Sequence, residues 1–254
     1  MADALAGTAA LVTGSSSGIG AATARRLAAE GAAVALVARR RDRLEQLADS
    51  IRQAGGAAHV VQADVTEPQH AAGAVQQAAD RFGRLDIVVN NAGVMLLGPA
   101  LQTTTGEWDR MVALNVQALL HVTHAALPHL VDAAGTSPRR VADIVNISST
   151  AGRVARPGSS VYNLTKFGVN AFSESLRQEM LAHRVRVGVV EPGTVDTELV
   201  DHVSTDVREA ARQQVAGIEA LRPEDIADSV AYIVTRDRRV AVNEMLVRAG
   251  DQSW

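Results

Sequence analysis

Short apolar runs alternate with longer amphipathic segments along the whole chain. The apolar runs are continuous in Val, Ile, Leu and Ala, which is typical of strands that a parallel sheet buries on both faces. They lie at residues 9–13, 33–38, 58–63, 87–90, 141–147, 185–190 and 245–247. The segments between them have helical periodicity and lie at residues 18–30, 41–54, 68–81, 106–131, 161–183 and 223–235.

The repeated strand–helix–strand units predict an α/β fold. We expect a Rossmann-type, doubly wound parallel sheet of about seven strands with helices on both faces. No linker, repeat or low-complexity tract interrupts the pattern, so we expect one domain over residues 1–254. Two stretches break the rhythm. Residues 132–140 are polar and predict an enlarged surface loop, and the charged stretch at about 194–220 follows a strand end and predicts a substrate lid.

Composition narrows the class of protein. A net charge of −3 provides no basic surface for nucleic acid or an anionic membrane, and no apolar run reaches the ~20 residues that span a bilayer. We see no signal peptide, and the chain has no cysteine, which fits the cytoplasm. His121, His124 and His129 lie near one another on a predicted helix, but without nearby acidic or cysteine ligands we expect no metal site.

A glycine-rich turn follows the first predicted strand and opens a helix. Its sequence, TGSSSGIG over residues 13–20, lets the backbone turn tightly and approach a pyrophosphate at the helix N-terminus. The spacing is G-x-x-x-G-x-G, and no Gly-Lys-Ser/Thr follows, which argues against a nucleotide triphosphatase loop. A tight turn without a ligand is the alternative. The candidate cofactor-binding residues here are Gly14, Ser16, Ser17, Gly18, Ile19 and Gly20.

The second predicted strand supplies a cofactor discriminator. NAD enzymes usually carry an acid that binds the ribose 2′-hydroxyl, whereas an Arg accommodates a 2′-phosphate. Here Ala38 occupies the expected acidic position, and Arg39 and Arg40 follow it, with no acid before Asp42. This pattern predicts NADP(H). The alternative is a solvated, basic helix start, since arginine is abundant in this chain.

Further polar residues follow the other strands, at the edge where ligands of open α/β sheets bind. Asp64 and Val65 are candidates for the adenine amino group, and Asp64 is equally a candidate helix cap. Small residues after the fourth strand allow close approach of a cofactor ribose. The candidates at these strand ends are Asp64, Val65, Asn91, Ala92, Gly93, Ser149, Pro192, Gly193, Thr194 and Thr197.

The only lysine of the chain lies four residues after one of its two tyrosines. Lys166 and Tyr162 therefore share a face of a predicted helix, with Cβ atoms about 5–6 Å apart. A nearby cation favours the phenolate, so we expect a lowered tyrosine pKa and a proton donor usable near neutral pH. The alternative is an accidental pair on a helix surface.

Taken together, TGSSSGIG, NNAG, Asn115, Ser149, Tyr162-x-x-x-Lys166 and Pro192-Gly193 resemble the short-chain dehydrogenase/reductase family. The resemblance covers essentially the whole chain in the right order. Within the family, segments such as NNAGVMLLGP and EPGTVDTEL look most like its clavulanic acid (clavaldehyde) dehydrogenase-like members.

The resemblance implies a role for each matching residue. Tyr162 is the general acid when a carbonyl is reduced and the base when an alcohol is oxidised. Lys166 binds the nicotinamide ribose and lowers the pKa of Tyr162, while Ser149 positions the substrate oxygen. Asn115 holds a water that links Lys166 to solvent, and Thr194 and Thr197 anchor the nicotinamide carboxamide.

The resemblance also implies an activity and an assembly. We expect an NADPH-dependent reductase of a small aldehyde or ketone, working as a homodimer or homotetramer. The alternatives are an NADP(H)-binding sensor without turnover, or an epimerase or dehydratase built on the same fold. Residues 242–250 lack the glycine-rich stretch that the family often has near its last strand, which weakens the inference of the usual tetramer interface.

Two side features have two interpretations each. Arg153 and Arg156 either meet an acidic substrate or are solvated loop charges. The run from Met95 to Leu97 either lines an apolar substrate pocket or belongs to the core.

Overall fold

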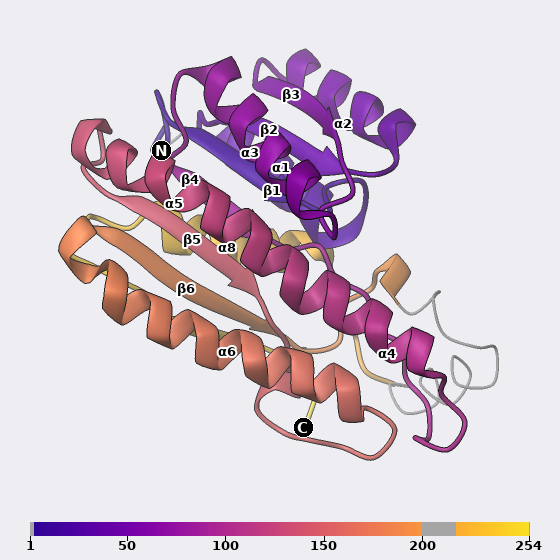
Figure 1. Cartoon of the computed structure of the whole chain (residues 1–254). Coiled ribbons are helices and arrows are strands. Elements are labelled where there is room, and N and C mark those ends of the chain that lie inside the picture. Colours follow the sequence, from indigo (N-terminus) through magenta and orange to yellow (C-terminus); the bar gives the residue numbers. More distant parts are fainter. Residues whose placement is uncertain (1–2, 200–216, 254) are drawn as a thin grey trace.

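Seven parallel strands form one sheet at the centre of the molecule (Figure 1). The computed structural model describes residues 3–199 and 217–253. The strand order is β3-β2-β1-β4-β5-β6-β7. The strands are β1 (Ala9–Thr13), β2 (Ala33–Ala38), β3 (Ala57–Gln62), β4 (Ile87–Asn90), β5 (Ala142–Ile147), β6 (Val185–Pro192) and β7 (Glu244–Val247). The Rossmann-type prediction is confirmed.

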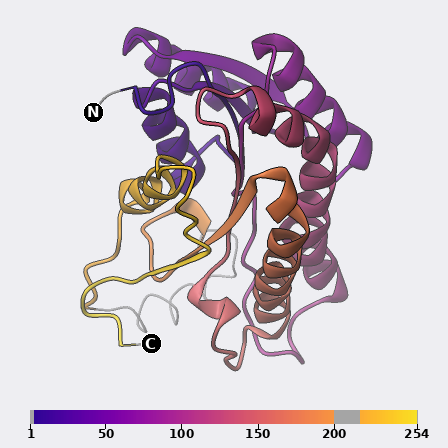
Figure 2. The ribbon, with the colours of Figure 1, turned by 90° about the vertical axis from the view of Figure 1, so that its left-hand side faces the viewer.

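Helices cover both faces of the sheet. One face carries α1 (Gly18–Ala29), α2 (Arg41–Gln53) and α8 (Pro223–Val234), and the other carries α3 (Pro68–Phe82), α5 (Ala118–Thr136) and α6 (Ser160–Met180). Figure 2 shows α8, in yellow, and α6, in orange, on opposite sides of the sheet. The short helix α4 (Thr105–Val112) precedes α5 and contacts α6.

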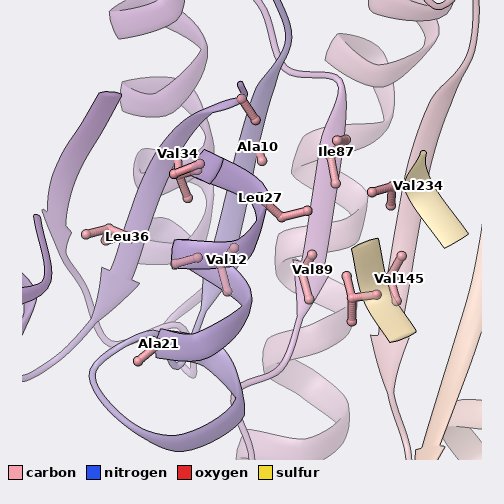
Figure 3. Close-up of a cluster of buried hydrophobic side chains, with 14 of the residues drawn as sticks. Ala10, Val12, Ala21, Leu27, Val34, Leu36, Ile87, Val89, Val145 and Val234 are labelled. Atoms are coloured by element: carbon pink, nitrogen blue, oxygen red, sulfur yellow. The ribbon is translucent and has the colours of Figure 1, made fainter. Parts of the chain in front are cut away.

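The central strands β1, β2, β4, β5 and β6 are largely buried, which explains their continuous apolar sequences, whereas the edge strands β3 and β7 are partly exposed. In β1, Val12 faces α1 and α8, whereas its neighbour Leu11 packs into the core beneath α3 and α5. Figure 3 shows the first of these cores, where Leu27 of α1 lies over the sheet among Val12 and Val89. A strand without polar alternation can be accommodated only in such a sandwich of layers.

One predicted helix differs from its observed form. The segment predicted at 106–131 is α4 followed by a π-helical turn, Ala113–Gln117, and then by α5. Helix α5 continues to Thr136 with Pro128 inside it, so the loop predicted at 132–140 begins later than expected. Ala133 and Ala134 are buried, and their packing favours continued helix over the loop that local composition suggested.

The predicted substrate lid falls largely outside the described residues, because residues 200–216 are not described. Of its flanks, Val195 forms a parallel bridge with Leu221. None of the helices in the described ranges is long and apolar enough to cross a membrane.

Candidate active site

The glycine-rich turn after β1 is held by close backbone packing. Gly14 has φ +65°, and a Cβ there would lie 2.9 Å from the Cα of Ala92. A Cβ on Gly20 would lie 2.4 Å from the carbonyl oxygen of Gly14, and Gly18 has φ +52°. Side chains are therefore excluded at Gly14 and Gly20, on either side of the N-terminus of α1.

The N-terminus of α1 leaves its first amide groups without a side-chain cap. Its N-cap, Ser17, makes no capping hydrogen bond, and the first turn has no acidic residue. Such a terminus is a ready binding site for an anion. Together with the glycine turn, it fits the pyrophosphate of a dinucleotide.

Basic side chains lie beside this turn. The Arg40 guanidinium donates to the Ser16 Oγ at 2.9 Å and the Ser17 Oγ at 2.8 Å. Arg40 and Arg43 form ion pairs of 3.0 and 2.5 Å with Glu198. Arg43 and Arg40 lower the pKa of Glu198 to about 2. A cavity of about 450 Å³ lies here between α1, α2 and the start of α8. Sequence reasoning missed Arg43 and Glu198 because their proximity depends on the fold.

The residues expected to meet adenosine occupy neighbouring strand ends. Arg39 is largely exposed, and its guanidinium lies 4.0 Å from the Asp64 carboxylate. Asp64 also accepts hydrogen bonds from the backbone and hydroxyl of Thr66. Burial opposes ionisation of Asp64, but the Thr66 hydrogen bonds and Arg39 outweigh it and lower its pKa. Asp64 is not the helix cap considered above, because the N-cap of α3 is Glu67, and the adjacent Val65 is buried.

The segment after β4 is tied to the end of β1. The Thr13 hydroxyl accepts hydrogen bonds from the backbone amides of Asn91 and Ala92, both at 3.0 Å. The side-chain amide of Asn91 donates to the backbone carbonyl of Thr13. Gly93 packs against Asn115, whose Oδ1 would lie 3.3 Å from a Cβ at that position. This segment therefore holds the glycine turn at a fixed distance from the site described next.

Ser149, Tyr162 and Lys166 lie together at the carboxyl ends of β5 and β6, with Tyr162 and Lys166 buried and Ser149 half-buried. Ser149 caps the short 3-10 turn Thr150–Gly152, and its hydroxyl hydrogen-bonds to that of Tyr162. Tyr162 and Lys166 are both 7% exposed. The Lys166 Nζ lies 5.7 Å from the centroid of the Tyr162 ring and donates to the Ile147 carbonyl at 2.9 Å.

The expected lowering of the tyrosine pKa is wrong for this structure. Burial raises the pKa of Tyr162 to about 12, although the hydrogen bond from Ser149 opposes the rise. Burial likewise lowers the pKa of Lys166 to about 8. Removal from water disfavours the charged form of both groups, and the Lys166 ammonium is directed to the Ile147 carbonyl rather than to the phenol oxygen.

Asn115 lies in the π-helical turn between α4 and α5. Its Oδ1 accepts from the Val94 amide at 2.8 Å, and its Nδ2 donates to the Val94 carbonyl at 2.9 Å and to the Thr165 hydroxyl at 3.2 Å. Thr165 in turn donates to the Tyr162 carbonyl. Single π-helical turns occur frequently at functional sites. The turn therefore fastens the Gly93–Val94 segment to the helix that carries Tyr162 and Lys166.

The turn after β6 completes this edge of the sheet. The Gly193 amide donates to the Val247 carbonyl, and the Thr194 amide donates to the Oε1 of Gln252. Thr197 reaches the glycine turn, since its Cγ2 would lie 3.2 Å from a Cβ on Gly18. The structure thus brings the candidate residues to one edge, as the positions of the strand ends predicted.

A buried carboxylate beneath the site escaped sequence reasoning. Glu191, at the end of β6, is fully buried and accepts 2.7 Å hydrogen bonds from Arg153 Nε and Asn170 Nδ2. Arg153 also pairs with Glu244. With two carboxylates already bound, Arg153 is not the solvated loop charge considered above and is not placed for an acidic substrate.

Two features left open by the sequence remain, namely the apolar run from Met95 to Leu97 and the candidate metal ligands. Leu96 is buried in a small apolar cluster with Met111 and Tyr162, and Met95 and Leu97 pack against it. The run from Met95 to Leu97 therefore packs in a core cluster that includes Tyr162. Within the described ranges, no group of three His, Asp or Glu side chains is arranged to hold a metal ion.

Comparison with known proteins places this geometry in a family. The family model described as short chain dehydrogenase matches residues 8–208. A glycine betaine reductase of Emericella nidulans is 39% identical over 249 residues, which are 98% of this chain but only 19% of that protein. An uncharacterised oxidoreductase of Staphylococcus saprophyticus is 34% identical and covers 96% of each chain.

Solved structures give the same result. The closed form of a serine dehydrogenase complexed with NADP+ has a TM-score of 0.88 and 31% identity, over 97% of each chain. A 3-ketoacyl-(acyl-carrier-protein) reductase from Brucella melitensis complexed with NADH has a TM-score of 0.86 and 30% identity, over 98% of this chain and 100% of the other.

The narrower likeness to clavaldehyde dehydrogenase-like members is not supported, because the relatives found are a glycine betaine reductase and uncharacterised oxidoreductases. The family itself agrees with the motifs, the sheet order and the cluster at its carboxyl edge. The chain belongs to the short-chain dehydrogenase/reductase family of oxidoreductases.

Proposed function

We propose that this protein is an NADP(H)-dependent oxidoreductase that reduces a small aldehyde or ketone to an alcohol and catalyses the reverse oxidation. One observation carries the proposal. The half-buried hydroxyl of Ser149, the buried hydroxyl of Tyr162 and the buried ammonium of Lys166 form one cluster at the same edge of the sheet as the glycine turn. Proton transfer and cofactor binding are thereby brought to one place.

The chemistry divides between cofactor and protein. A bound nicotinamide supplies or accepts the hydride. Ser149 and Tyr162 donate hydrogen bonds to the carbonyl oxygen, which polarises the carbonyl. Tyr162 then gives its proton to that oxygen as the alcohol forms. Because its pKa is about 12, the phenol is protonated at neutral pH and ready to act as an acid.

Lys166 and Asn115 support the proton transfer. An ammonium has three donors, and the Ile147 carbonyl engages one Lys166 proton, so the others are available to ribose hydroxyls. The positive charge of Lys166 lowers the cost of the phenolate that the reverse reaction needs. The Asn115 side chain is occupied by Val94 and Thr165. A relay water at this position is therefore held by the main chain of the π-helical turn.

The cofactor contacts follow the strand ends. The backbone of the glycine turn binds the pyrophosphate, Arg39 and Arg40 bind the 2′-phosphate, and Thr194 and Thr197 bind the carboxamide. The remaining proposed contacts are Ser16, Ser17 and Ile19 with the phosphates, Asp64 and Val65 with adenine, Asn91, Ala92 and Gly93 with ribose, and Pro192 and Gly193 with nicotinamide.

Three observations support NADP(H) over NAD(H). Ala38 ends β2 without an acid. Arg40 is anchored by Ser16 and Ser17 beside the uncapped helix. The related serine dehydrogenase was crystallised with NADP+, although the related Brucella reductase was crystallised with NADH.

Turnover tests the proposed reaction. Oxidation of NADPH, with NADH in parallel, is measured across a panel of small aldehydes and ketones. We expect turnover with NADPH and a loss of at least about a hundredfold in Tyr162→Phe, since acid–base groups contribute roughly 10²–10⁴-fold. An active Phe variant contradicts the assigned acid. Cofactor binding without turnover indicates a sensor, and product formation without net cofactor oxidation indicates an epimerase or dehydratase.

Binding tests the cofactor separately. Arg40→Ala should weaken NADPH binding about tenfold or more while leaving NADH unchanged, because a charge-assisted hydrogen bond is worth about 1.5–3 kcal/mol. Arg41→Ala is the matched control, since Arg41 pairs with Glu45 at 3.2 Å on the exposed side of α2. Equal dissociation constants for the two cofactors in the unmodified protein would refute the NADP(H) assignment.

A further inference from the structure

Gln252 lies in the short segment that follows β7, a segment for which the sequence motifs suggest no role. Its side chain is 6% exposed. Its Oε1 accepts a 2.9 Å hydrogen bond from the backbone amide of Thr194. The amide plane also covers Gly193 closely, because a Cβ there would lie 2.1 Å from Oε1 and 2.9 Å from Cδ. Gly193 is therefore a glycine because Gln252 occupies the space above it.

The turn at Gly193 and Thr194 is held from three directions. The Gly193 amide donates to the Val247 carbonyl at 2.7 Å, and the Thr194 carbonyl accepts from the Leu221 amide at 3.0 Å. Gln252 provides the third contact and the only one made by a side chain among those described for this turn. Gln252 thus helps to fix the position of the Thr194 amide relative to β7 and Leu221, which hold the rest of the turn.

We infer that Gln252 is a positioning residue for the nicotinamide half of the cofactor, acting through Thr194. The inference rests on the proposed function, in which Thr194 contacts the carboxamide. A misplaced nicotinamide loses hydride transfer steeply, since an error of about 1 Å can cost about a hundredfold in rate. The adenosine half is bound by Arg40 and the glycine turn at the other end of the site, so its binding does not depend on Gln252.

Two substitutions separate the hydrogen bond from the packing. Gln252→Met keeps the length of the side chain but removes the acceptor, whereas Gln252→Glu keeps an acceptor oxygen. Gln178→Met is the matched surface control, because Gln178 is exposed on α6, where its side-chain amide donates to Glu174 at 2.8 Å. Thermal unfolding of each variant establishes that it is folded at the assay temperature.

Two ligands separate the halves of the site. The first probe is 2′,5′-ADP, which has the adenosine half without nicotinamide, and the second is NADPH, whose nicotinamide fluorescence reports its surroundings. We expect Gln252→Met to bind 2′,5′-ADP within twofold of the unmodified protein, to change the fluorescence of bound NADPH, and to lower the single-turnover hydride transfer rate about tenfold. Gln252→Glu should restore most of both signals.

The opposite outcomes are distinct. Unchanged fluorescence and transfer rate in Gln252→Met overturn the inference, and so does an equal loss of 2′,5′-ADP and NADPH binding, which indicates a general structural role. If the unmodified protein binds neither probe, the proposed function itself fails.

A double substitution covers the case in which Gln252→Met does not fold. Gly193→Ala should reproduce the nicotinamide defect by pushing the Gln252 amide away. Gly193→Ala combined with Gln252→Ala should be no worse than Gln252→Ala alone, since the space is then free. Full additivity of the two defects would overturn the inference, because residues that act through one contact are non-additive.

Discussion

Lys166 shows how a single residue can be unfavourable for folding and still be present. Its ammonium is buried, and burial lowers its pKa from 10.5 to about 8, a difference that corresponds to about 3 kcal/mol. Between these pH values the unfolded chain binds a proton at Lys166 that the folded protein does not. The free energy of unfolding is therefore not reduced by Lys166 above pH 10.5, and it falls as the pH is lowered from 10.5 to 8.

Comparison with Lys166→Met isolates that effect. The free energy of unfolding in urea, measured at pH 7 and pH 10.5, should rise by about 3 kcal/mol more in the unmodified protein than in the Met variant. Tyr162 has a pKa raised to about 12, so its contribution to the free energy of unfolding falls above pH 10. That fall is the same in both proteins and cancels in the comparison. A pH-independent difference between the two proteins would contradict the burial of a charged lysine.

At the scale of the element, the turn between β1 and α1 depends on glycine for packing. Gly20→Ala directs a Cβ into the Gly14 carbonyl and the Asn91 amide, at 2.4 and 2.5 Å, and neither the backbone nor a hydrogen-bonded amide can move freely. We expect a loss of about 1–3 kcal/mol in unfolding free energy and weaker binding of NADPH.

Gly73→Ala provides the helix control for that change. Gly73 lies in α3 with nothing within 4 Å of an added Cβ, so the substitution should stabilise the protein by about 0.5–1 kcal/mol. Urea unfolding of both variants gives the comparison. Equal effects at the two positions would show that the turn tolerates a side chain after all.

The elements also show where sequence reasoning stops. Apolar runs separated by glycine-containing turns predicted the strands and their alternation with helices along the chain. The prediction works because burial of a strand on both faces requires an apolar sequence. The π-helical turn around Asn115 and the continuation of α5 beyond residue 131 to Thr136 were not predictable, since tertiary packing decides them. The same holds for contacts such as Glu198 with Arg43 and Gln252 with Thr194, which join residues more than 50 positions apart.

The direction of the Tyr162 pKa was also beyond the sequence. The i, i+4 spacing correctly predicted that Tyr162 and Lys166 are neighbours. Spacing carries no information about burial, however, and burial raises the pKa of Tyr162 in the folded protein, against the opposing hydrogen bond with Ser149. A motif thus predicts which groups meet, whereas the electrostatic result depends on the layers packed around them.

In the whole molecule, the two edges of the sheet formed by the carboxyl ends and by the amino ends of the strands have different roles. The candidate site occupies the carboxyl edge, whereas the amino edge has a buried ionic cluster. Asp143 is 1% exposed and accepts from Arg186 at 2.7 Å and from Arg139 at 2.6 Å. Both arginines also donate to main-chain carbonyls at the end of α8, including that of Val234. The cluster therefore fastens α8 to the sheet far from the chemistry.

Asp143→Asn tests this division. Removing the charge leaves two buried guanidinium groups without their partner, which costs about 3–5 kcal/mol. We expect that loss in unfolding free energy, with kcat and KM unchanged at a temperature where the variant is folded. Asp49→Asn, which breaks an exposed pair with Arg52, should cost less than about 1 kcal/mol. A fall in kcat for Asp143→Asn in a fully folded sample would mean that the amino edge controls the geometry of the site.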